Sequence, residues 1–121
     1  MITIHQFFPR SHRPDPSPFC AKVDTFLRIH DIPAEGKAAN PQKGPKKKLP
    51  YIEMDGQKIG DSDIIIQALA AKFGIDPEAG LTASQKTESF FIRKALEESF
   101  YYIVMYGRWI EPRGWNDTKR L

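Results

Sequence analysis

The amino-acid sequence predicts an α/β domain with a four-stranded mixed sheet, followed by a long helix. Residues 2–38 have a strand–helix–strand order, which implies a parallel strand pair with a right-handed crossover. Residues 50–60 begin with proline and contain two short strands that flank a tight turn. From residue 84 to about 109 no residue breaks a helical pattern. At 121 residues the chain can build one sizeable core.

The first strand is predicted over residues 2–7, where apolar and polar side chains alternate. His5 fits there as an ordinary polar strand residue. The segment 8–18 contains four prolines and is therefore predicted to be a loop. Its Arg10 and Arg13 have two interpretations, contact with an anionic ligand or simple exposure to solvent.

The first helix is predicted from Ser17 to about His30. Ser17 is a good N-cap, and Pro18 suits the first helical position because its missing N–H would have no partner there. The second strand follows at residues 34–38. The buried face of this helix should consist of Phe19, Val23, Phe26, Leu27 and Ile29.

A proline-led hairpin forms the second half of the predicted sheet. Pro50 precedes a short apolar strand at residues 51–54. Asp55 and Gly56 are the residues that a two-residue turn with positive φ at both positions requires, and residues 57–60 would return antiparallel.

A second helix should begin at Asp61 and Ser62, which are both strong N-cap residues. The order of proline, strand, turn, strand and capped helix is that of the second half of a thioredoxin-like domain. The apolar residues of this helix lie at mainly helical spacing and comprise Ile64, Ile65, Ile66, Leu69 and Phe73.

The last part of the chain is predicted to be helical. Residues 75–83 contain proline and glycine and are predicted to be a linker, and Thr82 with Gln85 forms a capping box. Residues 100–106 are apolar or aromatic on every side, which is typical of a helix that is buried. The residues after 109 cannot cover such a surface, so either the chain is a truncated form or the helix binds a second copy or another protein.

Composition limits the classes of function. The net charge is +3, and much of the excess lies in the lysines of residues 43–48, which favour a solvated loop. Nucleic-acid binding is not indicated, because interleaved aromatic residues are missing there. Cys20 has no second cysteine to pair with, no zinc-ligand spacing is present, and no apolar run reaches the roughly 20 residues that span a membrane. A reducing, cytoplasmic location is expected.

Three motifs in this order resemble the glutathione S-transferase N-terminal domain. They are SPFC at 17–20, KLPYIEMDG at 48–56 and DS at 61–62. With the proline-rich segment before SPFC, they most resemble the metaxin-like, failed-axon-connections-like branch. The resemblance implies strand order 2-1-3-4, with a thioredoxin-like glutathione-binding domain over 1–74, a linker over 75–83 and the start of an all-α domain over 84–121.

The resemblance also implies a glutathione site. Ser17 would orient the thiol of glutathione, the co-substrate, and a cis peptide bond before Pro50 would let the Leu49 backbone hold the cysteinyl segment. Asp61 and Ser62 would bind the γ-glutamyl group at a helix N-terminus, where unpaired N–H groups favour a carboxylate. A less specific candidate is Lys48, next to a glutathione carboxylate. The electrophile that would receive the thiol is not identified.

Two alternatives remain open from the sequence. Ser17, Asp61 and Ser62 are also explained as ordinary helix caps, and Cys20 as a small buried apolar residue instead of a one-thiol redox group. The chain would then be a non-enzymatic interaction module that uses the helix over 84–110 to form a homodimer or bind a partner protein.

Overall fold

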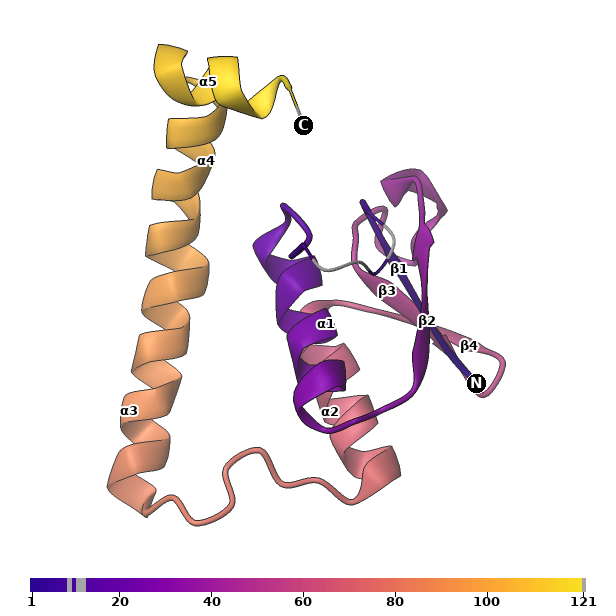
Figure 1. Ribbon diagram of the computed structural model, residues 1–121. Helices are drawn as coiled ribbons and strands as arrows, with labels where there is room; N and C mark the ends of the chain where they lie inside the picture. Colours follow the sequence, from indigo (N-terminus) through magenta and orange to yellow (C-terminus); the bar gives the residue numbers. More distant parts are fainter. Residues whose placement is uncertain (9, 11–12, 121) are drawn as a thin grey trace. The chain divides into compact units, whose positions relative to one another are not determined.

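The computed structural model describes residues 1–8, 10 and 13–120. Residues 9, 11 and 12 of the predicted loop and residue 121 lie outside the described residues. The chain divides into two compact units, Met1–Pro77 and Glu78–Leu121 (Figure 1). Each unit has its own set of helices and is described by itself.

The first unit contains a four-stranded mixed sheet in the order β2-β1-β3-β4. β1 pairs with β2 in parallel and with β3 antiparallel, and β3 pairs antiparallel with β4. The strands are β1 (Ile2–Gln6), β2 (Ala34–Ala38), β3 (Tyr51–Met54) and β4 (Gln57–Gly60). The predicted fold class and strand order are confirmed.

Two helices, α1 (Pro18–Ile29) and α2 (Ser62–Phe73), cover one face of this sheet (Figure 1). β1 presents alternate residues to them because successive side chains of a strand point to opposite faces. The centre of the core consists of fully buried side chains from the sheet and from both helices, namely Ile4, Val23, Leu27, Ile52, Ile65 and Leu69.

The predicted buried face of α1 was wrong at Ile29, whose exposed fraction is 70%. Ile29 follows the buried Leu27 by two residues, and two residues turn an α-helix through about 200°. On α2, Ile64 and Phe73 of the predicted apolar set are exposed as well. Only one side of each helix is therefore buried in the core.

The turn between β3 and β4 has the expected backbone, and the lysine-rich loop has a short helix that was not predicted. Asp55 and Gly56 both have positive φ, 52° and 76°, as the two-residue hairpin requires. The lysine-rich loop includes a short 3₁₀ helix, η1 (Pro41–Lys43), before it reaches β3. The lysine side chains of this loop are exposed.

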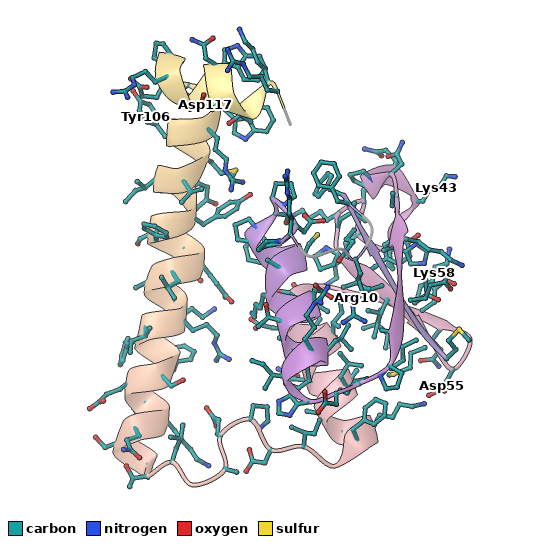
Figure 2. The ribbon with its side chains drawn as sticks, viewed as in Figure 1. Arg10, Lys43, Asp55, Lys58, Tyr106 and Asp117 are labelled. Atoms are coloured by element: carbon teal, nitrogen blue, oxygen red, sulfur yellow. The ribbon has the colours of Figure 1, made fainter. Side chains whose placement is uncertain are left out.

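Arg10 fastens the proline-rich loop to the rest of the first unit. Its Nε lies 2.5 Å from Asp24 Oδ1 on α1, and its Nη1 donates to the Ala34 carbonyl of β2 at 2.8 Å. Figure 2 shows Arg10 between α1 and the sheet. A Cβ on Gly36 would lie 2.5 Å from Arg10 Cγ, so the loop crosses β2 where the strand has no side chain. The charge of Arg10 is therefore paired within the fold. The side chain of Arg13 is exposed.

The second unit is helical, and its helices are α3 (Ala83–Lys94), η2 (Ala95–Phe100), α4 (Tyr101–Trp109) and α5 (Pro112–Thr118). The predicted capping box is present, because Thr82 and Gln85 each accept the other's backbone N–H. The prediction of one unbroken α-helix was wrong in a single respect. η2 is a π-helical stretch, in which hydrogen bonds reach one residue further along the chain.

No element was predicted after residue 109, and the structure has α5 there. Glu111 caps it by accepting the N–H of Arg113 at 3.0 Å, and Pro112 occupies the first helical position. Gly114 then lies against α4, since a Cβ on it would be 1.6 Å from the Gly107 carbonyl oxygen. α5 therefore packs on α4 through a close backbone contact.

None of the helices of the second unit contains a buried residue. Within the part of the chain that the structure describes, no helix is long and apolar enough to cross a membrane. The exposed large apolar residues from α3 to α5 are Phe90, Phe91, Ile92, Leu96, Phe100, Tyr102, Ile103, Tyr106, Trp109, Ile110 and Trp115.

Candidate glutathione site

Ser17 lies at the N-terminus of α1 as its cap. Its Oγ accepts the N–H of Cys20 at 3.4 Å, and its own N–H donates to Asp15 Oδ1 at 2.9 Å. Asp15 is buried, and its other oxygen accepts the N–H of Phe8 at 2.9 Å. The buried carboxylate therefore joins both ends of the proline-rich loop and fixes the Ser17 backbone. The Ser17 oxygen is the acceptor in its cap, so the hydroxyl can still donate its hydrogen to another group.

Cys20 is fully buried, and burial raises the pKa of its thiol to about 12. The Ser17 hydroxyl lowers this pKa and the Asp15 carboxylate raises it further. The thiol is therefore protonated at neutral pH and packs with Leu49 and Tyr51 as a small apolar side chain. This environment does not support one-thiol redox chemistry, which needs a thiolate.

The Leu49–Pro50 peptide bond is cis, as the resemblance implies. Both residues are buried directly before β3. Leu49 belongs to the same buried cluster as Cys20 and Tyr51, so the start of α1 and the start of β3 lie together at one end of the sheet. Lys48 is exposed in the preceding loop.

Asp61 caps α2, and α2 begins where the sequence predicts. The Oδ1 atom of Asp61 accepts the N–H of Asp63 at 3.0 Å and that of Ile64 at 3.4 Å. Its Oδ2 lies 3.9 Å from Lys46 Nζ. Asp61 has a φ of 77°, which few residues other than glycine adopt, so the chain turns sharply into the helix.

Ser62 is the first residue of α2, and its exposed fraction is 8%. Its Oγ accepts from Lys22 Nζ at 3.4 Å, and the same ammonium donates to Asp63 Oδ1 at 2.6 Å. Lys22 belongs to α1, so this contact brings the N-terminal half of α1 against the N-terminus of α2.

The first residues of α1 thus connect the Ser17 end of that helix both with the start of β3 and with the start of α2. Cys20, three residues after Ser17, lies in one buried cluster with Leu49. Lys22, five residues after Ser17, donates a hydrogen bond to Ser62. Lys48 and Asp61 have exposed side chains near these segments. Among the described residues, no group of three His, Cys, Asp or Glu is arranged to hold a metal ion.

Sequence reasoning did not identify Asp15 or Lys22 as part of this region. Asp15 had a local signal, because Asp often accepts the backbone N–H two residues on. Lys22 had none, since its partners are 40 and 41 residues away along the chain.

The chain matches a family model described as the glutathione S-transferase N-terminal domain over residues 18–114. It is 36% identical over 121 residues to a Rhodococcus isoprene-epoxide–glutathione S-transferase, with 95% of this chain and 51% of the relative covered. It is also 36% identical over 109 residues to Failed axon connections of Drosophila melanogaster, with 89% of this chain and 26% of the relative covered. The chain therefore spans about half the length of the first relative and about a quarter of the second.

Solved structures with the same fold include a diazinon-metabolizing glutathione S-transferase of the silkworm Bombyx mori. Its TM-score is 0.66 at 16% identity, and 98% of this chain and 62% of that chain are covered. Glutathione transferase F2 of Populus trichocarpa has a TM-score of 0.64 at 12% identity, with 93% and 57% covered. The resemblance and the thioredoxin-like fold predicted from the sequence are confirmed, and the chain belongs to the glutathione S-transferase N-terminal domain family.

Proposed function

We propose that the first unit binds glutathione and that the chain is part of a transferase that joins glutathione to an electrophile. The observation that carries this proposal is the contact of Lys22 with Ser62, because it places the start of α2 against α1 beside the Ser17 end of that helix. Family membership supports the same ligand.

The chemistry at the α2 N-terminus suits the γ-glutamyl end of glutathione, which has one carboxylate and one ammonium group. Asp61 already accepts the N–H groups of Asp63 and Ile64, so the N–H and hydroxyl of Ser62 are the donors for a carboxylate. The second oxygen of the exposed Asp61 carboxylate lies 3.9 Å from Lys46 Nζ, and it can also accept from a ligand ammonium group. The positive end of the helix dipole favours the ligand carboxylate as well.

Ser17 would act on the thiol in this proposal. A hydroxyl donor at a helix N-terminus stabilises a thiolate more than a thiol. It would therefore lower the pKa of the glutathione thiol. The sulfur would then attack a carbon of the electrophile. With an epoxide, the class named for the Rhodococcus relative, an S–C bond forms, a C–O bond breaks and the resulting alkoxide takes a proton from water. Leu49, Pro50 and Lys48 would hold the remainder of the peptide.

Calorimetric titration with reduced glutathione tests the proposal. We expect millimolar or tighter binding, weakened about three- to tenfold in Ser62→Ala by the loss of one hydrogen bond to a carboxylate. Ser89→Ala, which changes an exposed serine of α3, is the matched control and should bind like the original chain. Absence of heat at saturating glutathione would contradict the proposal.

Ser17→Gly separates thiol activation from binding. Glycine at an N-cap costs a helix only a few tenths of a kcal/mol relative to serine, so α1 should persist. We expect glutathione to bind nearly unchanged while the pKa of its bound thiol, followed by thiolate absorbance, rises. An unchanged thiol pKa would remove Ser17 from the mechanism.

A second candidate function is a non-enzymatic interaction module. It is favoured by the exposed apolar residues of the helix over 84–110, of which Phe91 is 66% and Ile103 is 65% exposed. We propose a second copy of this chain as the partner, and the corresponding experiment is given in the Discussion.

A further inference from the structure

Lys22 is not among the residues that the sequence assigns to the ligand, yet it contacts two residues of the α2 N-terminus. It is the fifth residue of α1, and its side chain is 26% exposed. Its ammonium group lies 2.6 Å from Asp63 Oδ1 and 3.4 Å from Ser62 Oγ. Ser62 itself is more than nine-tenths buried, so its contact with Lys22 is largely shielded from solvent.

The chemistry of these two groups determines the direction of the hydrogen bond. An ammonium group has three donors and no acceptor, whereas a hydroxyl can donate or accept as it rotates. Next to Lys22, the Ser62 oxygen must be the acceptor, and its hydrogen is directed elsewhere. The neighbouring positive charge also makes the hydroxyl a stronger donor.

We infer that Lys22 is a positioning residue, which holds the Ser62 hydroxyl as a donor toward the γ-glutamyl carboxylate of glutathione. This inference rests on the proposed function. It adds the reason why the Ser62 hydroxyl would donate to a ligand carboxylate and not accept from a donor. Asp63 keeps the ammonium in position, since it is the nearer of the two partners.

A purely structural role for Lys22 predicts something different. The Lys22–Asp63 ion pair connects α1 with α2, and its loss would lower stability without changing the ligand's own contacts. The pair is partly exposed, so its contribution to stability is small. Binding and stability must therefore be measured on the same variants.

The test is a double-mutant cycle of Lys22→Met and Ser62→Ala, with glutathione affinity measured by calorimetry and by NMR shift titration. Methionine keeps the length of the side chain and removes its donors. We expect Lys22→Met to weaken binding about three- to tenfold, and to have no further effect when Ser62→Ala is already present. Lys22→Arg, which keeps a donor-only cation, should restore binding to within about threefold.

Lys72→Met is the matched control. Lys72 is also a lysine of the first unit that pairs with a carboxylate, Asp55, but it lies at the other end of α2. We expect its glutathione affinity to equal that of the original chain, which excludes a general effect of net charge.

The outcomes separate this inference from the function it rests on. If the original chain does not bind glutathione, both are overturned. If it binds and Lys22→Met lowers only the melting temperature, the role of Lys22 is structural and the inference alone fails. If Lys22→Met weakens binding equally with and without Ser62, then Lys22 acts on the ligand directly, which also overturns positioning.

Discussion

His5 lies on the sheet face opposite to the one that α1 and α2 cover, stacked on Tyr51. The ring centroids are 4.2 Å apart and the planes differ by 7°. Burial lowers the pKa of His5, and the charges of Lys37 and Lys58 act in the same direction. The Glu53 carboxylate, 3.4 Å from Nε2, acts against this change. His5 is thus a structural residue, and its neutral form is the one that the fold favours.

This lowered pKa predicts a loss of stability in mild acid. As pH falls through about 6.5, the unfolded chain protonates His5 before the folded chain does, so the free energy of unfolding decreases. The decrease ends below the folded-state pKa and stays under about 1.4 kcal/mol per pH unit. His5→Phe keeps an aromatic ring against Tyr51 and should have a flatter urea-unfolding profile between pH 7 and 5. His30→Gln, at the exposed end of α1, is the control, and equal slopes in all three chains would refute the assignment.

Residue-scale features were predictable where their cause is local. Ser17 and Asp61 cap their helices, as a serine or aspartate before an apolar helical pattern indicates. The contacts of Lys22 with Ser62 and of Arg10 with Asp24 depend on tertiary structure, and no spacing in the chain encodes them. The functional roles of the predicted site residues stay predictions.

At the scale of elements, Gly114 makes a strong prediction about α5. A Cβ there would lie 1.6 Å from the Gly107 carbonyl oxygen, so Gly114→Ala must push α5 away from α4. Overpacking of this kind costs about 1–3 kcal/mol. The rings of Trp109 and Trp115, 5.8 Å apart, report the contact through near-ultraviolet circular dichroism, and this signal should diminish.

Gly107→Ala is the control for that experiment. A Cβ on Gly107 meets no atom within 4 Å, although its carbonyl is what Gly114 contacts. Alanine also favours a helix interior over glycine by about 1 kcal/mol. The tryptophan signal should therefore persist or increase, and a loss equal to that of Gly114→Ala would contradict the proposed packing.

The elements of the first unit were predictable because pattern, turn residues and caps agree with one another. β2, β3 and β4 have the predicted bounds, and the two turn residues have the positive φ that the hairpin requires. The elements of the second unit were harder to predict from the sequence. The π-helical η2 has no compositional signal. No helix was predicted after residue 109, although Pro112 suits the first position of a helix.

At the scale of the whole molecule, the apolar surface of the second unit predicts self-association. Sedimentation equilibrium at several concentrations should show a species of twice the 13.8 kDa chain mass. Ile103→Glu places a charge on that surface and should weaken the dimer tenfold or more. Thr87→Glu adds the same charge at an exposed polar position of α3 and should not. A strict monomer that binds no apolar dye would argue against this function.

The predicted domain limits, 1–74, 75–83 and 84–121, remain a proposal about this organisation. The sequence indicated the apolar character of residues 100–106, but a linear pattern does not specify which surface covers them. A helix of this kind gains its stability through packing against other elements, and that information is not local.

The strand order determines which strands lie at the edges of the sheet, where proteins can aggregate by strand pairing. β2 and β4 are the outer strands, and each bears one lysine, Lys37 and Lys58. A foreign strand that paired with either edge would have to displace or desolvate a charged side chain, which is how natural sheets resist edge-to-edge aggregation. Turbidity in concentrated preparations should therefore respond to changes in the helical unit and not to changes in the sheet. Lys37 and Lys58 should therefore oppose cross-β growth at both edges of the sheet.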